Sequence, residues 1–251
     1  MNAHYLARQI CKLQIPFESG SVHVWSAAVP LLAPILNDPE SLLSREELDR
    51  VDRFRPSGKK QEFLVGRALL RMILGSYCGI RPASVMFCYG HQGKPSVAST
   101  PHTSRRIAFN ISHSIDIIVI AICEGEEIGV DVECLNYLGD VTPICMDILA
   151  EAEVGDVLAL EVQQRRHAFC RYWVHKEAFL KQMGCGLSIA PRDVQVSFEG
   201  PGRSEISCPG HHPRRRIFGL EFPTAEGYVA ALATPVQNVV ARLFDVGAAL
   251  H

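Results

Sequence analysis

The strongest constraint on the fold lies in residues 109–133, where a polar cluster, an apolar run and a pair of acids follow one another. Residues 117–123 are rich in β-branched side chains and too few to span a bilayer, so they predict a buried strand. The turn-like residues 124–127 lead into a second strand at 128–133. We therefore expect these two strands to form a buried hairpin.

The second of these strands carries two acids at alternate positions. Because side chains alternate along a strand, Asp131 and Glu133 leave one face while Val130 and Val132 leave the other, toward a core. Two neighbouring carboxylates repel each other unless water, a basic residue or a hard cation such as Mg²⁺ lies between them. The alternative is that both acids lie on the wet face of an antiparallel sheet.

A second segment changes this balance, because residues 173–181 fit a helix that ends at Gly184. Trp173, Glu177 and Lys181 follow one another at i, i+4 spacing, so Glu177 can project beside the two acids of the strand. Three carboxylates from a strand and a helix suit an octahedral Mg²⁺ that also takes substrate oxygens. The alternative is an ordinary ion pair between Glu177 and Lys181 on a helix surface.

Three segments then carry a family resemblance. FNISHS at 109–114, IGVDVE at 128–133 and WVHKEAFLK with GCGLS at 173–188 resemble, in order and spacing, the three motifs of the 4′-phosphopantetheinyl transferases of the Sfp type. The resemblance includes Gly93-Lys94-Pro95 and GRALLR at 66–71, and it runs from about residue 44 to 228. Ile115 and Ile117 depart from it, since the family usually has Gly and an aromatic residue there, which predicts a stiffer loop.

The resemblance implies an α+β fold of two similar halves related by a pseudo-two-fold, each a small antiparallel sheet with packed helices, and a cleft between them. We expect a loose N-terminal extension at 1–20, an N-terminal half at 21–123 and a C-terminal half at 127–251. The apolar periodicity and the capping signals predict helices at 44–54, 59–77, 143–160 and 163–183. They predict further strands at 22–29, 85–89, 107–111, 194–198, 216–222 and 228–233.

The resemblance also implies an activity, which is transfer of 4′-phosphopantetheine from coenzyme A to a serine hydroxyl of an apo acyl, peptidyl or aryl carrier protein, with release of 3′,5′-ADP. Asp131, Glu133 and Glu177 would bind Mg²⁺, and Glu177 could also accept the serine proton. Lys181 would stabilise the leaving phosphate. The residues expected in catalysis are therefore Glu177, Lys181 and Asp131.

Coenzyme A would be held by basic and polar side chains. The resemblance places Ser112, His113, Lys94 and Lys181 against its phosphates, and it selects Arg67, with Arg50 as a second choice. Lys60, Arg67 and Arg71 form a narrow stripe on the predicted helix, and such a stripe is most often a solvated face. Likewise, Lys94 could simply be an exposed turn residue and His113 a structural one.

Composition excludes several other classes. The chain has 251 residues, 47% of them hydrophobic and 21% charged, which fits a globular protein with an ample core. A formal charge of −2 argues against a general nucleic-acid binder. Nine cysteines without any C-x-x-C spacing predict buried thiols in a reducing cytoplasm and no zinc cluster. With no long apolar run or signal peptide, we expect a cytoplasmic monomer without membrane or nucleic-acid partners.

Two other functions remain open at this point. A metal-dependent phosphohydrolase would use the same acids but needs a positioned water, and it would hydrolyse coenzyme A without any acceptor. A non-catalytic module that binds a carrier protein or a nucleotide would keep the fold but lose an acid. All three acids are present, which counts against the module.

Overall fold

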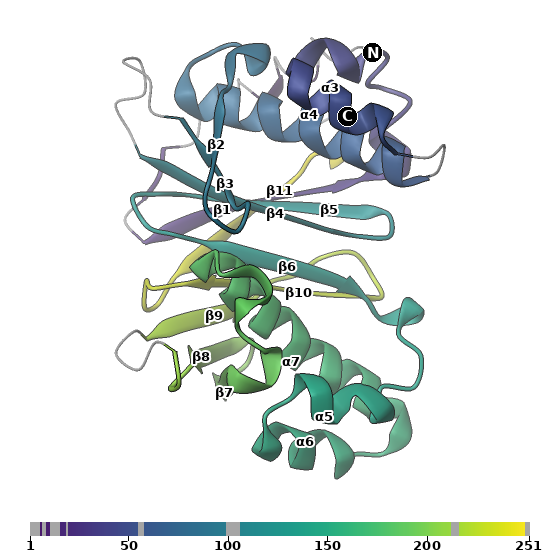
Figure 1. Cartoon of the computed structure of the whole chain (residues 1–251), viewed down its shortest axis with the longest axis vertical. Helices are drawn as coiled ribbons and strands as arrows, with labels where there is room; N and C mark the ends of the chain where they lie inside the picture. Colours follow the sequence, from purple (N-terminus) through teal and green to yellow (C-terminus); the bar gives the residue numbers. More distant parts are fainter. Residues whose placement is uncertain are drawn as a thin grey trace.

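Two β-sheets lie face to face between two layers of helices in the computed structural model, which describes residues 6, 9–10, 16–18, 20–54, 58–98, 106–211 and 216–248. Figure 1 shows the layers stacked from helices α3 and α4, through the sheets, to helices α5–α7. Most of the predicted extension at 1–20 falls outside the described residues. The α+β class with small sheets is confirmed.

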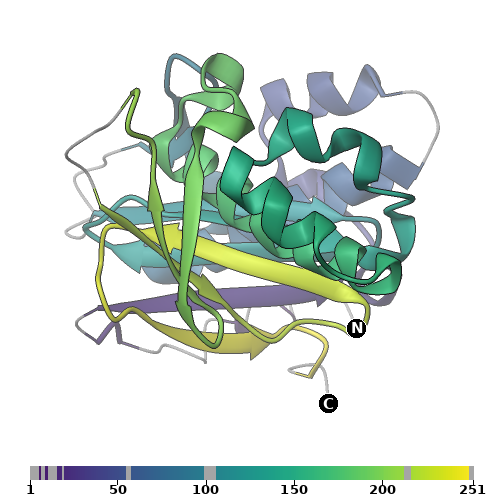
Figure 2. The ribbon, with the colours of Figure 1, turned by 90° about the horizontal axis from the view of Figure 1, so that it is seen from below.

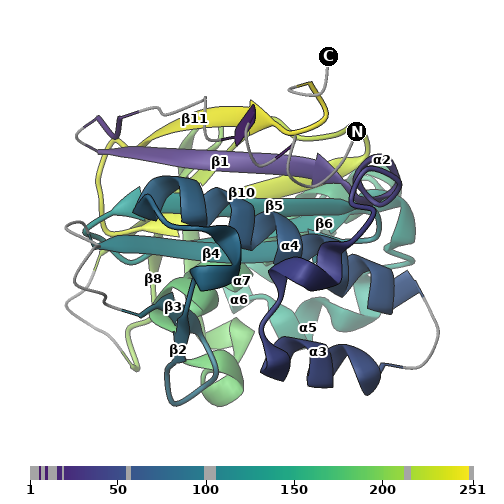
Figure 3. The ribbon, with the colours of Figure 1, turned by 90° about the horizontal axis from the view of Figure 1, so that it is seen from above.

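The first sheet has the strand order β11-β1-β5-β4. Its strands are β1 (Ser21–Ala28), β4 (Ile107–Ser114), β5 (Ile117–Glu124) and β11 (Val240–Asp245). Strand β5 pairs in antiparallel fashion with both β4 and β1, whereas β1 and β11 pair in parallel. Figure 3 shows helix α4 (Gly58–Cys78) lying across the outer face of this sheet. Alternate residues of β5, such as Ile118 and Ile120, bury their side chains beneath it.

The helices of this half begin and end where the local signals predict. Helix α3 (Arg45–Asp52) starts with a capping box, in which Ser44 Oγ accepts from the Glu47 amide and the Glu47 carboxylate accepts from the Ser44 amide. Helix α4 is followed by Gly79, whose φ of +67° is the left-handed conformation that glycine adopts at low cost. A small separate hairpin, β2 (Phe87–Tyr89) and β3 (Pro95–Val97), follows.

The second sheet is antiparallel throughout, with the order β6-β10-β9-β8-β7. Its strands are β6 (Gly129–Cys134), β7 (Gln195–Gly200), β8 (Arg203–Ser207), β9 (Ile217–Glu221) and β10 (Tyr228–Thr234). Helix α7 (Val162–Met183) covers its outer face, with α5 (Cys145–Ile148) and α6 (Glu151–Leu158) beside it (Figure 2). The structure also has helix α2 (Val29–Leu32) and short 3-10 turns at 39–42, 82–84, 135–137, 142–144, 186–188 and 191–193.

The inner faces of the two sheets share one apolar core. It contains alternate residues of β1 and β5, including Val24 and Val119, and alternate residues of β6 and β10, including Val130 and Val132. The period of two along each strand therefore separates two surfaces, one facing the other sheet and one facing a helix. In β6 this leaves the acids on the helix side.

The predicted hairpin of residues 117–123 and 128–133 is wrong. Strand β5 pairs with β1 and β4, while β6 pairs with β10 in the other sheet. The actual hairpin is β4–β5, with Ile115 and Asp116 at its tip. Two adjacent apolar strands predict a hairpin from local pattern alone, but the connection at 125–128 carries the chain from one sheet to the next instead.

Other differences concern element boundaries. The predicted helix at 143–160 is divided into a 3-10 turn, α5 and α6, with a break at Leu149 and Ala150. Strands β3, β8 and β11 were not predicted. Strand β11 returns to the first sheet, so the last strand pairs with β1 instead of joining the sheet of residues 129–234. No helix of the described residues has the length and apolar character needed to cross a membrane.

Candidate active site

Asp131 and Glu133 lie on the face of β6 that meets helix α7. Trp173 of α7 donates its indole N–H to Glu133 Oε1 at 3.2 Å. The helix can approach this strand closely because residue 129 is glycine, and any Cβ there would overlap the carbonyl oxygen of Ala178. Close packing of α7 on β6 therefore brings the acids of the strand next to the polar side of the helix.

The polar residues of FNISHS lie on β4 and form hydrogen bonds with the edge of β6 that does not pair with β10. Strands β4 and β6 lie side by side at the edges of their sheets, and side chains take the place of a backbone ladder between them. Asn110 Oδ1 accepts from the Val130 amide at 2.9 Å, and Ser114 Oγ accepts from the Cys134 amide at 3.1 Å. This satisfies amides of β6 that face away from β10.

Two serines of the same strand also contact the acids directly. Ser112 donates to Asp131 Oδ1 at 2.8 Å, and Ser114 donates to Glu133 Oε2 at 2.9 Å. The two serines and the two acids share the same i, i+2 spacing, which matches them pair by pair across the junction. Ser112 was among the predicted site residues; Ser114 and Trp173 were not, although this spacing could have indicated Ser114.

Lys181 joins the strand and the helix at the centre of this site. Its ammonium donates to Asp131 Oδ1 at 2.6 Å and to Ser112 Oγ at 2.8 Å. Glu177, one turn earlier, forms no hydrogen bond or ion pair within the described part of the chain. The structure therefore brings Ser112, Asp131, Glu133, Glu177 and Lys181 together, as predicted from their separate motifs.

The surroundings raise the pKa of two acids of this cluster, Asp131 and Glu177. Burial raises the pKa of Asp131, which is 3% exposed, with a further upward contribution from Glu133, while Lys181 and Ser112 oppose it. Burial likewise raises the pKa of Glu177, helped by the negative charges of Asp131 and Glu133. A group of acids with elevated pKa values in one place is typical of a functional site.

A divalent cation would offset the repulsion between these carboxylates, but their side chains are not arranged around a common metal position. Among the described residues, no three His, Cys, Asp or Glu side chains lie close enough together to hold a metal ion. Two observations nevertheless fit a divalent cation. Asp131 Oδ2 is buried without any hydrogen-bond partner, and the three acids supply the oxygen ligands that Mg²⁺ prefers.

Arg67 and Arg71 lie on α4, and of the predicted basic stripe Arg71 is buried, Arg67 is mostly covered and Lys60 is partly exposed. The Arg71 side chain is 2% exposed and donates to Glu47 Oε2 at 2.8 Å and to the carbonyls of Pro82 and Val85. Arg67 faces the other carboxylate oxygen of Glu47 at 3.4 Å, and its Nη1 is buried without a hydrogen-bond partner. From the sequence, Glu47 was predicted only as part of the capping box at Ser44, and its pairing with these arginines was not predicted.

Arg50 and Arg67, the two arginines predicted to bind coenzyme A, both lie near the ring of Phe63. The guanidinium of Arg50 lies 5.0 Å from the ring centroid of Phe63, and that of Arg67 lies 5.7 Å from the same ring and 5.1 Å from that of Phe87. Burial lowers the pKa of Arg67, and the positive charges of Arg50 and Arg71 add to this, against the carboxylate of Glu47. Its ordinary pKa is so high that it remains a cation at neutral pH.

The two remaining predicted contacts are already engaged with acids. His113 is exposed at the end of β4, with Nδ1 2.8 Å from Glu62 Oε1. Lys94 lies in the turn of the β2–β3 hairpin and donates to Glu127 Oε2 at 2.9 Å. The assignment of both residues to nucleotide phosphates stays a prediction.

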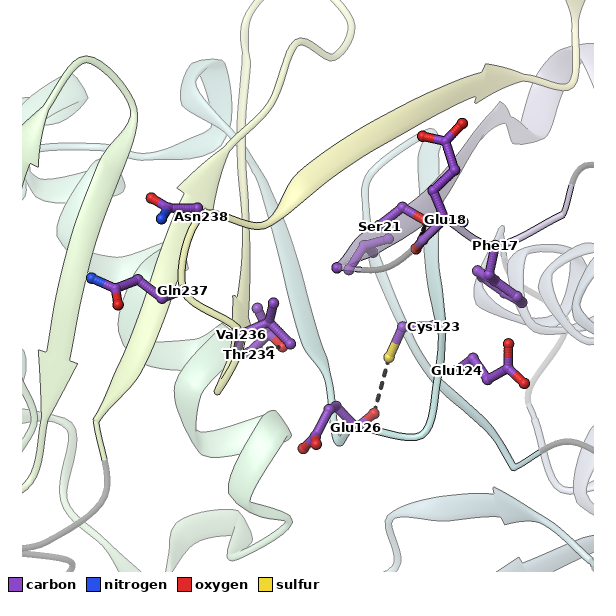
Figure 4. Close-up of a pocket in the computed structure, with 12 residues that line it drawn as sticks. Phe17, Glu18, Ser21, Cys123, Glu124, Glu126, Thr234, Val236, Gln237 and Asn238 are labelled. Atoms are coloured by element: carbon purple, nitrogen blue, oxygen red, sulfur yellow. Dashed lines mark hydrogen bonds between the residues drawn. The ribbon is translucent and has the colours of Figure 1, made fainter.

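A cavity of about 270 Å³ lies between this turn and the cluster of Ser112, Asp131, Glu133, Glu177 and Lys181. Its lining includes Lys94, Asn110, Glu177 and Lys181. A larger cavity of about 610 Å³ lies elsewhere, between the start of β1 and the loops after β5 and β10 (Figure 4). In the close-up, Cys123 donates to the carbonyl of Glu126 and acidic and amide side chains surround the opening, but none of the predicted site residues lies there.

Comparison with known proteins finds one family across most of the chain. The model described as the 4′-phosphopantetheinyl transferase superfamily matches residues 127–233, and the model described as 4′-phosphopantetheinyl transferase, N-terminal, matches residues 36–125. The 4′-phosphopantetheinyl transferase HetI of Nostoc sp. is 33% identical over 170 residues, which are 68% of this chain and 71% of that protein. The 4′-phosphopantetheinyl transferase Sfp of Bacillus subtilis is 27% identical over 176 residues, or 68% and 74% of the two chains.

Among solved structures, the holo-ACP-synthase from Plasmodium yoelii aligns with 44% of this chain and 95% of its own, at 19% identity and a TM-score of 0.34. A likeness this distant carries no conclusion about the site.

Proposed function

This chain belongs to the 4′-phosphopantetheinyl transferases of the Sfp type, and on that premise we propose that it transfers 4′-phosphopantetheine from coenzyme A to a serine hydroxyl of an apo acyl or peptidyl carrier protein. In this reaction the serine oxygen attacks the phosphorus that bears the pantetheine arm. The bond between the two phosphates breaks, and 3′,5′-ADP leaves. The observation that carries the proposal is the meeting of Asp131, Glu177 and Lys181 beside one cavity.

Each residue of the cluster has a part in this proposal. Glu177, with its raised pKa and without a hydrogen-bond or ion-pair partner among the described residues, accepts the serine proton. Lys181 donates to the phosphate on which negative charge grows as the bond breaks. Ser112 donates its one proton to Asp131 and accepts from Lys181, so it orients these two groups, and a contact with the phosphate would require its hydroxyl to turn away from Asp131.

A divalent cation, Mg²⁺ by its preference for carboxylate oxygens, would be held by Asp131, Glu133 and Glu177. When bound it would supply positive charge that neutralises the phosphates of the donor. The support is the unpartnered Oδ2 of Asp131 and the elevated pKa values of Asp131 and Glu177. Lys181 also places its positive charge beside Asp131, against Oδ1.

The phosphates of coenzyme A would meet a second group of residues. Arg67 has a buried Nη1 without a hydrogen-bond partner, its guanidinium lies near two aromatic rings, and Arg50 lies over one of the same rings. His113 extends from β4 beyond Ser112 and could contact a phosphate once Glu62 releases it. Lys94 lines the same cavity as Lys181.

The test is intact-mass analysis of an apo carrier protein incubated with this protein, coenzyme A and Mg²⁺. We expect the carrier protein to gain one phosphopantetheine group. This gain should be lost when Mg²⁺ is chelated, and also when a folded Asp131→Asn or Glu177→Gln variant is used in place of the wild type. A parallel incubation without the acceptor addresses the phosphohydrolase alternative. Hydrolysis of coenzyme A there, with no modified carrier, would overturn the proposal.

A further inference from the structure

The turn that carries Lys94 forms one wall of the cavity beside the catalytic cluster. Gln92, Gly93, Lys94 and Pro95 line it from the β2–β3 hairpin, opposite residues at the end of α7. Strands β2 and β3 form a sheet of only two short strands, with three paired positions. Such a hairpin is marginally stable by itself, so contacts outside it must hold the wall in place.

Phe87 and Val97 pack against the core of the first sheet, and the ammonium of Lys94 holds the turn end of the hairpin. Besides the 2.9 Å bond to Glu127 Oε2, it donates to the carbonyl of Gln182 at 2.9 Å and to that of Ile128 at 3.2 Å. The carbonyl of Gln182 is in the last turn of α7, where carbonyls lack helical partners and the helix dipole favours a cation. One side chain therefore joins the hairpin to α7 and to the connection between the two sheets.

The stem of Lys94 fits against the same helix end. Gly184 follows α7 with a φ of +64°, and a Cβ at that position would lie 3.1 Å from Lys94 Cδ. The Lys94 side chain is 17% exposed, so most of it is covered by these neighbours. The contact explains why the helix ends in glycine in terms of both its left-handed conformation and the space that the lysine needs.

Glu127 is the charged partner in this arrangement. Burial alone would raise its pKa, but the hydrogen bond and charge of Lys94, together with Arg106, lower it below the ordinary value. Arg106 donates to the other carboxylate oxygen at 3.0 Å. Glu127 is thus ionised at neutral pH and holds Lys94 from the connection that precedes β6.

We propose that Lys94 is a positioning residue, which fastens the β2–β3 hairpin over the cavity and thereby shapes the binding site for coenzyme A, and that Glu127 is its counter-ion in this role. The inference rests on the proposed function, because it takes the cavity to be part of the coenzyme A site. A lysine ammonium has three protons. All three are donated within the protein here, so a direct contact with phosphate would have to break one of these bonds.

The two roles for Lys94 predict opposite effects of Glu127→Gln. If Lys94 fastens the hairpin, Glu127→Gln and Lys94→Met each raise the KM for coenzyme A by about fivefold or more, with a smaller change in kcat. The KM of the double variant is then no higher than the higher of the two single-variant KM values, because both substitutions remove the same contact. If Lys94 binds phosphate and Glu127 only restrains it, Glu127→Gln lowers the KM, and the proposal fails.

Hydrogen exchange gives a readout that does not depend on activity. Without coenzyme A, amides of residues 87–97 should exchange faster in Glu127→Gln and Lys94→Met than in the wild type. Glu126→Gln is the matched control, since it removes the same charge from the exposed neighbouring residue and should change neither exchange nor KM. Unchanged exchange at 87–97 in both test variants would refute the fastening role. A wild-type protein without transferase activity would refute the proposed function instead, and the exchange result would still decide whether Lys94 holds the hairpin.

Discussion

The ammonium of Lys181 lies 2.6 Å from Oδ1 of Asp131, so this lysine pairs across to strand β6 and not along its own helix with Glu177. The alternative of a plain helical ion pair is therefore not what the structure forms. The pairing also leaves Glu177 available as a base and makes Lys181 the charge partner of a buried carboxylate. Both consequences can be tested separately.

Lys181→Met should lower kcat by about a hundredfold or more, because a contact made to the leaving phosphate contributes mainly in the transition state. The melting temperature should fall as well, since the variant leaves the buried carboxylate of Asp131 without the ammonium that pairs with it. Adding Asp131→Asn should restore the melting temperature but not the rate. A loss of kcat below about fivefold, measured by carrier-protein mass, would contradict the role of Lys181, because it amounts to less than about 1 kcal/mol of barrier.

The pH dependence of kcat/KM should report Glu177. A general base must be deprotonated, and burial and the neighbouring acids raise the pKa of Glu177, so activity should rise with pH through a value above the ordinary glutamate range. Glu133→Gln removes one of the negative charges responsible. Even with a reduced maximum rate, its acidic limb should move to lower pH. A limb that stays in place or moves upward would exclude Glu177 as the titrating base.

Truncation of Arg67 should affect coenzyme A binding, whereas truncation of Arg71 should affect stability. Arg67→Ala should mainly raise the KM for coenzyme A, because a charge-assisted bond to phosphate is worth about 1.5 to 3 kcal/mol and forms before the reaction. Arg71→Ala should mainly lower stability, by about 3 to 5 kcal/mol, because it leaves the buried carboxylate of Glu47 without its closest partner. Calorimetric titration with coenzyme A and denaturant unfolding separate the two effects. Unchanged coenzyme A affinity in folded Arg67→Ala would exclude Arg67 from the site.

Ile115→Gly should stabilise the protein. Ile115 is the first central residue of the two-residue β4–β5 turn and has a φ of +52°, a conformation that favours glycine and is strained for a β-branched residue. Relief of this strain is worth about 1 to 2 kcal/mol, against the greater freedom that glycine gives the unfolded chain. Ile115→Val keeps the branched side chain and should bring no gain. A lower melting temperature for Ile115→Gly than for Ile115→Val would show that contacts of Ile115 outweigh the strain.

The sequence by itself determined the features that depend on neighbours along the chain. The capping box at Ser44, the ends of α4 and α7 at glycines and the helix-facing side of Asp131 and Glu133 all follow from short-range periodicity and backbone preference. The motif resemblance pointed to Ser112, Asp131 and Lys181 in separate segments, and the structure places their side chains in hydrogen-bond contact, while their roles stay predictions. The predictions of the cap, the helix ends and the strand faces hold because each uses information contained within a turn of helix or a few residues of strand.

Only the tertiary structure decided which elements meet. Strand β6 has an alternating pattern that would suit many partners, and it pairs with β10, almost a hundred residues later, because the inner faces of two sheets must share one core. The same packing buried Arg71 instead of leaving it on a solvated stripe, and it placed Lys94 against Glu127 and the end of α7. Pairing and burial of this kind depend on the competition of all surfaces for contact, and no local pattern encodes its outcome.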